Sequence, residues 1–82
     1  MQVQPTTMPV AEFQDFEQAI RAAGRDPCAF KAQLFIATLL DAGTIWRRVH
    51  VVTPGAAAQY DASGATRWTE NFARHLARGF FG

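Results

Sequence analysis

The stretch RDPCAFKAQLFIATLLDAGT, residues 25–44, constrains the fold more than any other part of the chain. A helix could begin here, because Asp26 can cap its N-terminus and Pro27 suits its first turn. A strand fits as well, because the apolar set that begins at Phe30 alternates with a more polar set that begins at Lys31. Gly43 would end a short turn into the next segment, which is rich in β-branched residues. The stretch therefore allows two different folds.

The strand is the better interpretation of these residues. On a helix, the large apolar side chains would spread around most of the circumference. A chain of 82 residues has little interior in which to bury such a helix. We therefore expect residues 30–39 to form a strand that pairs antiparallel with residues 44–53.

Two amphipathic helices and a third strand complete the pattern. Residues 10–23 and about 66–78 each carry an apolar stripe at helical spacing. Pro54-Gly55 is a turn signal that precedes a third strand at 55–61. The side chains expected to pack against the sheet are Phe13, Phe16, Ile20, Trp68, Phe72 and Leu76.

The element order, α-β-β-β-α, predicts an α+β fold. Its simplest packing is a two-layer sandwich, with a three-stranded antiparallel sheet and two helices packed on one face. The length fits a single domain over residues 10–82, preceded by a flexible N-terminal arm at residues 1–9. We also expect Phe80 and Phe81 to fold back over the core.

Two resemblances support this order. AAGRDPCAF, followed by strands and then by WTENFARHLARGFFG, resembles a group of small uncharacterised bacterial α-β-β-β-α proteins, from Phe13 to Gly82. This likeness implies a strand at 30–39 and no assigned chemistry. The element order is also similar to that of the double-stranded RNA-binding domain. That family places a lysine cluster at the start of its last helix, whereas residues 63–68 here hold a single basic residue, Arg67.

The sequence contains no recognisable catalytic motif. Cys28, His50 and His75 lack the spacing of a metal site, and nothing pairs the thiol with a base. We therefore expect a non-enzymatic protein without a cofactor or metal. A single cysteine suits a reducing cytoplasm, and no segment reaches the roughly 20 apolar residues that span a bilayer. We expect a cytoplasmic protein with no membrane partner.

The open face of the sheet is the most informative surface. Strand alternation places aromatic and cationic side chains together on it, namely Lys31, Phe35, Trp46, Arg48 and His50. Such a face suits a protein partner, most simply a second copy in a homodimer. It could instead bind single-stranded nucleic acid, or be covered by the N-terminal arm or the chain's last residues. A further basic stripe on the last helix consists of Arg67, Asn71, Arg74 and Arg78.

Overall fold

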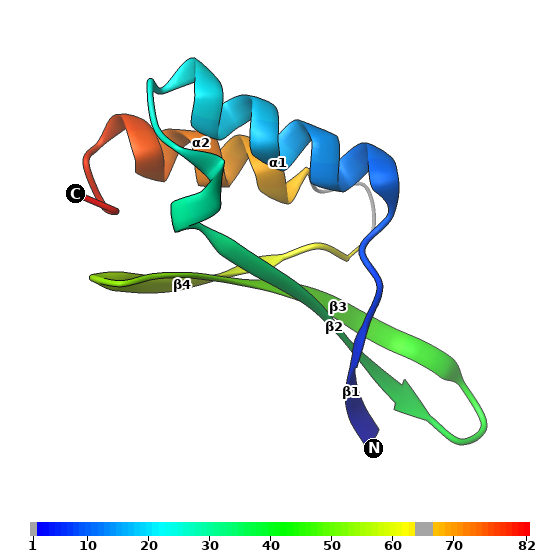
Figure 1. Cartoon of the computed structure of the whole chain (residues 1–82). Coiled ribbons are helices and arrows are strands. Elements are labelled where there is room, and N and C mark those ends of the chain that lie inside the picture. The colour runs from blue at the N-terminus through cyan, green and yellow to red at the C-terminus, as the bar shows by residue number, and fades with distance from the viewer. Residues whose placement is uncertain (1, 64–66) are drawn as a thin grey trace.

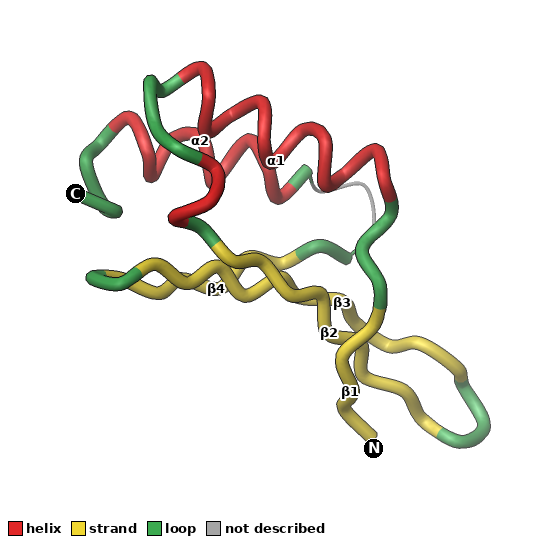
Figure 2. The backbone as a smooth tube through the Cα atoms, viewed as in Figure 1, coloured by secondary structure: helices red, strands yellow, loops and turns green. Residues whose placement is uncertain are grey.

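The computed structural model describes residues 2–63 and 67–82, and it forms a sheet covered on one face by two helices (Figure 1). Figure 2 shows the same two layers by element type. The elements in chain order are β1 (Gln2–Thr6), α1 (Val10–Ala22), the short 3₁₀ turn η1 (Pro27–Ala29), β2 (Lys31–Leu39), β3 (Gly43–Thr53), β4 (Ala56–Asp61) and α2 (Trp68–Ala77). The α+β class is confirmed.

The ambiguous stretch resolves into a strand. β2 pairs antiparallel with β3, with Leu34 opposite Val49. The helix signals at its start are satisfied within one turn, because the Asp26 carboxylate accepts a 2.9 Å hydrogen bond from the Cys28 backbone N–H at the start of η1. The capping residue and the proline thus shape a single 3₁₀ turn before the chain extends.

The sheet has four strands, so the expectation of three was wrong. The additional strand is β1, which lies in the segment expected to be a flexible arm. It pairs antiparallel with β2, from Gln2 opposite Thr38 to Thr6 opposite Leu34. The strand order is β1-β2-β3-β4, which puts β1 at an edge. An edge tolerates Pro5, because its missing N–H can face outward.

The core lies between the helices and the helix-facing side of the sheet. Phe16, Phe72 and Trp68 are 0–2% exposed and pack ring against ring, with centroids 4.9–6.2 Å apart. Phe81 folds back into this core, as expected, whereas Phe80 remains 47% exposed. The other core residues are Ile20, Phe30, Leu34, Val49, Val51, Tyr60, Ala62 and Leu76.

Three details differ from expectation or lie beyond the structure. Phe13 was expected in the core but is 43% exposed, because it stands at the rim of α1 beside the edge of β2. The expected helix start at residue 66 lies outside the described residues, as does position 1 of the arm.

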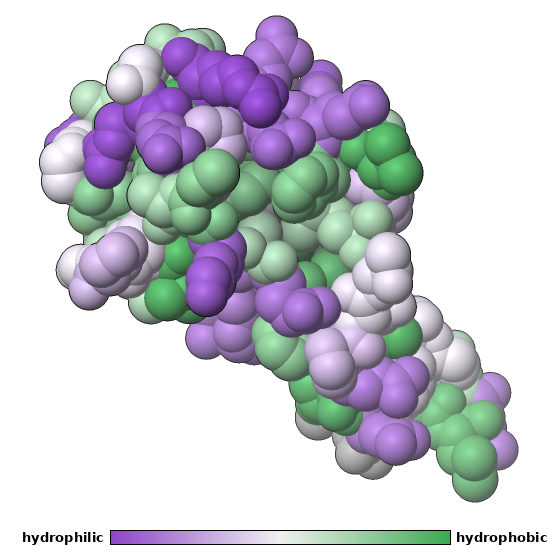
Figure 3. Space-filling model, viewed as in Figure 1, coloured by the Kyte–Doolittle hydropathy of each residue, from purple (hydrophilic) through white to green (hydrophobic). Residues whose placement is uncertain are grey.

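The sheet extends beyond the helices. The turn joining β2 and β3, with β1 beside it, reaches away from α1 and α2, and the molecule measures 44 × 23 × 19 Å (Figure 1). We call residues 37–46 the projecting end. Ile45 is the residue that β3 leaves unpaired where its register with β2 shifts, between Trp46 opposite Ala37 and Thr44 opposite Thr38, and it is 41% exposed. Leu40, at the turn, is fully exposed, and Figure 3 shows a green, apolar group at this end of the molecule among purple and white residues.

Candidate functional site

The side chains predicted to share the open face do lie on one side of the sheet. Phe35 is opposite Arg48, and Lys31 and Gln33 are opposite Val52 and His50. Because Val49 and Val51 are buried beneath the helices, their neighbours along β3 point the other way. The register therefore brings Lys31, Phe35, Trp46, Arg48 and His50 onto the uncovered face.

Four of these residues form two close pairs. The Arg48 guanidinium carbon lies 4.6 Å from the ring centre of Trp46. The rings of Phe35 and His50 lie 4.5 Å apart between centroids. Each aromatic ring thus has a partner within the chain, and both rings are half-buried.

One stretch of β2 lacks a neighbour on its outer side. β1 pairs with β2 only over residues 34–38, so the edge of residues 31–33 stays bare. A pocket of about 700 Å³ opens there and curves around the edge from the helix side to the open face. We call it the β2-edge pocket. Its lining consists of Phe13, Phe30, Lys31, Ala32, Gln33, Phe35, His50 and Val52.

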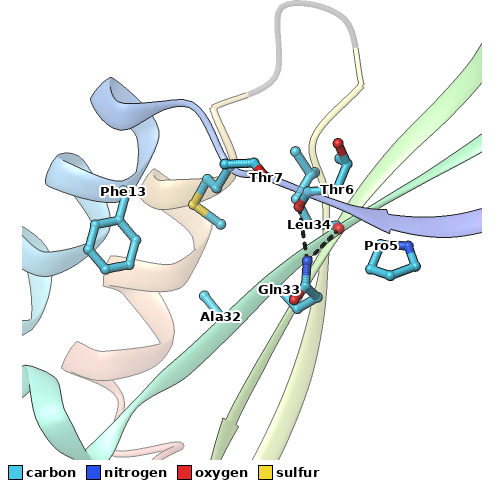
Figure 4. Close-up of a pocket in the computed structure, with 8 residues that line it drawn as sticks. Pro5, Thr6, Thr7, Phe13, Ala32, Gln33 and Leu34 are labelled. Carbon is cyan, nitrogen blue, oxygen red and sulfur yellow. Dashed lines mark hydrogen bonds between the residues drawn. The ribbon is translucent and has the colours of Figure 1, made fainter.

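A smaller hollow of about 450 Å³ adjoins this pocket where β1 ends (Figure 4). The Gln33 side-chain amide donates to the backbone oxygens of Thr6, at 2.9 Å, and of Leu34, at 3.0 Å. These bonds hold the Gln33 side chain across the end of β1. Phe13 and Ala32 line both hollows, so the two form one continuous depression along the β2 edge.

Sequence reasoning found part of this site. Lys31, Phe35 and His50 were expected on the binding face and do line the pocket. Phe13 and Phe30 were missed, because their spacing assigns both to the core. No sequence signal shows that β1 stops short of the end of β2. That gap in pairing is what uncovers Phe13.

The residues considered for catalysis stand apart from one another. Cys28 is exposed on η1. His75 Nδ1 and Tyr60 Oη share a hydrogen bond of 2.8 Å at the other side of the molecule. Among residues 2–63 and 67–82, no three His, Cys, Asp or Glu side chains gather as metal ligands would. No helix in these segments has the length and apolar character to cross a membrane.

Two neighbouring groups on β4 have shifted acidities. Burial raises the pKa of Tyr60 to about 12, because the phenolate would lose its hydration. Hydrogen bonds from Ser63 lower the pKa of Asp61, and the nearby Arg48 guanidinium lowers it further. Asp61 is therefore an anion beside the cationic part of the open face.

Comparison with known proteins found no family model, curated protein or solved structure that matches the chain. The two resemblances noted in the sequence therefore stay predictions.

Proposed function

We propose that the protein is a non-enzymatic self-association module whose partner is a second copy of the chain. In this dimer the turn at the projecting end of each copy fills the β2-edge pocket of the other. The observation that carries the proposal is the match between Leu39-Leu40-Asp41 at the turn and an apolar pocket with a lysine at its rim. Both halves of the contact are present in every chain.

The turn between β2 and β3 exposes two leucines followed by an aspartate. Leu40 is 100% exposed and Leu39 is 42% exposed. Neighbouring exposed apolar side chains are typical of interfaces. Asp41 follows them, and it makes no ion pair with the residues that the structure describes.

The β2-edge pocket complements this turn. Phe13, Phe30 and Val52 offer apolar walls, and the volume lies within the roughly 300–1,000 Å³ typical of pockets that bury a ligand. Lys31 contributes an ammonium group to the lining, and it has no ion pair within residues 2–63 and 67–82. Leucine side chains would fill the pocket while Asp41 meets Lys31.

The geometry suits a closed dimer. Pocket and turn lie at opposite ends of β2, roughly 25 Å apart at about 3.3 Å per residue. Two copies related by a two-fold axis can lie antiparallel, so that each turn reaches the other's pocket and no site is left open. The isolated chain exposes 5301 Å². A folded monomer of this mass exposes about 4,900 Å², so this chain exposes somewhat more surface than is typical of its size.

Single-stranded nucleic acid is less well matched to this surface. Bases would have to stack on Trp46 and Phe35. The Arg48 guanidinium already lies over the Trp46 ring, and the His50 ring already lies against Phe35. Asp61, opposite Arg48 in the register, would also repel a phosphate backbone.

Sedimentation equilibrium tests the proposal. We expect the wild type to sediment at twice its chain mass of 9.1 kDa. Leu40→Asp should sediment as a folded monomer, because it would bury an unpaired charge in the pocket. Ala73→Asp is the matched control, since Ala73 is exposed on α2 and belongs neither to the turn nor to the lining of the pocket. A monomeric wild type at high protein concentration would contradict the proposal.

A charge exchange tests the Lys31–Asp41 contact. Lys31→Asp and Asp41→Lys should each weaken the dimer, since each places two like charges together. The double variant should regain most of the wild-type affinity. If the double variant is weaker than either single variant, Lys31 and Asp41 do not meet.

A further inference from the structure

The second edge of the sheet, β4, lies beside α2 and has no strand on its outer side among residues 2–63 and 67–82. The Ala62 backbone N–H donates to the Arg47 oxygen of β3 at 2.9 Å. Hydrogen-bonding direction alternates along an antiparallel strand. The backbone groups of Ala58 and Tyr60 therefore also face β3, whereas those of Ala57, Gln59 and Asp61 face outward.

β4 lacks the features that usually block an edge. Its sequence, AAAQYD, contains no lysine or proline, and its register with β3 continues without a bulge. The opposite edge differs, because β1 contains Pro5. Of the two edges, β4 is the better template for an added strand.

Two arginines, Arg74 and Arg78, lie beside this edge. A hollow of about 350 Å³ lies between β4 and α2, and it is lined by Gln59, Tyr60, Asp61, Asn71, Arg74, His75 and Arg78. Arg74 donates to the Asn71 side-chain oxygen at 2.9 Å. Within the described residues, neither Arg74 nor Arg78 has a carboxylate partner. The bond between Tyr60 and His75 fixes α2 at this height over β4.

The spacing of the arginines matches that of a strand. Side chains four residues apart on a helix are separated by about 5–6 Å at Cβ, and alternate side chains of a strand by about 6.5–7 Å. Carboxylates at alternate positions of a strand beside β4 would therefore reach both Arg74 and Arg78. Asp61 is the one acidic residue in the hollow, and its side chain projects to the open face, as that of Gln59 does. An acidic side chain of the added strand would therefore avoid Asp61 and meet the arginines if it pointed to the helix side.

We propose that β4 accepts an extended acidic segment of a partner protein as a fifth strand, with Glu or Asp at alternate positions facing Arg74 and Arg78. A second copy fits this edge poorly. Pairing β4 with itself would bring four guanidinium groups together, and the strand offers only Ala56, Ala58 and Tyr60 to the helix side. This contact is separate from the β2-edge pocket, so it does not depend on self-association.

Peptide binding tests the inference. The probe is a fluorescein-labelled peptide, Thr-Glu-Val-Glu-Val-Thr, and its control has Gln in place of both Glu. We expect the Glu peptide to bind roughly tenfold more tightly than the Gln peptide, from two exposed ion pairs. Binding should slow hydrogen exchange at the amides of Ala57, Gln59 and Asp61. The double variant Arg74→Ala, Arg78→Ala should lose this preference, and Arg21→Ala on α1 should keep it.

Several results would overturn the inference. The Glu peptide could fail to bind, or bind no more tightly than the Gln peptide. The double arginine variant could bind the Glu peptide as tightly as the wild type does. The peptide could also slow hydrogen exchange at amides of β2 and not at those of β4. Polyphosphate that displaces the peptide, with no amide of β4 protected by either ligand, would indicate a general anion site on α2. The monomeric Leu40→Asp variant should bind the Glu peptide normally, which separates this result from the dimer proposal.

Discussion

The two ends of the sheet use the same strands in opposite ways. Under the helices, Val49 and Val51 of β3 are fully buried against aromatic rings. In the projecting end, Ile45 of the same strand is 41% exposed, at the point where the pairing of β3 with β2 shifts by one residue. The two parts therefore differ in what covers the strand and in the regularity of its pairing. Stability belongs to the covered part, and the projecting end is the part for which we propose a contact with a partner.

The largest test of this comparison replaces each tryptophan. Trp68 is 2% exposed among Phe16, Tyr60 and Phe72, so Trp68→Ala should cost about 3–5 kcal/mol of unfolding free energy. Trp46→Ala, on the open face, should cost about 1 kcal/mol or less. Urea unfolding followed by circular dichroism measures both. Equal losses would mean that the two parts of the sheet are not energetically distinct.

High pH should weaken the covered part of the sheet. Tyr60 is 4% exposed, and burial raises its pKa from the ordinary 10.0 to about 12. The folded state thus favours the neutral phenol. Its stabilising effect is complete below pH 10 and is lost as the pH rises toward 12, by roughly 2 kcal/mol in all.

Absorbance at 295 nm measures this titration directly, because Tyr60 is the only tyrosine. Tyr60→Phe should remove the pH dependence of unfolding between pH 10 and 12. A phenol that ionises near pH 10 in the folded protein would show that water reaches the ring.

A smaller effect is expected where the two parts meet. Glu12 of α1 accepts hydrogen bonds of 3.0 Å from Trp68 Nε1 and from Arg47 Nη2 of β3. Glu12→Ala should therefore cost about 1–2 kcal/mol in thermal or urea unfolding. Glu12→Gln should lose less, because its amide oxygen can still accept from Trp68. Equal losses in the two variants would assign the whole effect to the charge.

The smallest effect on stability should come from the turn. Leu40 is fully exposed, so Leu40→Ser should change the unfolding free energy of the monomer by about 0.5 kcal/mol or less. The measurement requires a protein concentration below the dissociation constant of the proposed dimer. A large loss under these conditions would place Leu40 in a packed environment within its own chain.

Periodicity was sufficient to predict most of the elements. The alternation from Phe30 onward identified β2 despite its helix-like start, and the spacing of Trp68, Phe72 and Leu76 identified α2. β1 could not be predicted in this way. Its residues, QVQPT, have little strand propensity, and they gain their structure from hydrogen bonds to β2.

The candidate site was only partly predictable for a similar reason. Alternation shows which side of a strand a residue faces, and this placed Phe35 and Trp46 correctly on the open face. It does not show whether a helix covers that side, or where the pairing shifts by one residue, as it does at Ile45. Nor does it show where pairing with a neighbouring strand stops, and the β2-edge pocket depends on that point.

The pairing of β1 has a consequence for the order in which the sheet opens. β2, β3 and β4 follow one another through short turns, whereas Gln2 and Thr38 are separated by the whole of α1. Such a distant contact forms late in folding, and a short edge strand is among the first segments to detach in the native state. We expect the β2 amides bonded to β1 to exchange with solvent faster than those between β2 and β3. Each detachment would lengthen the bare edge of β2 from residues 31–33 to the full nine residues of the strand, and the exchange rates would report how often the longer edge is present.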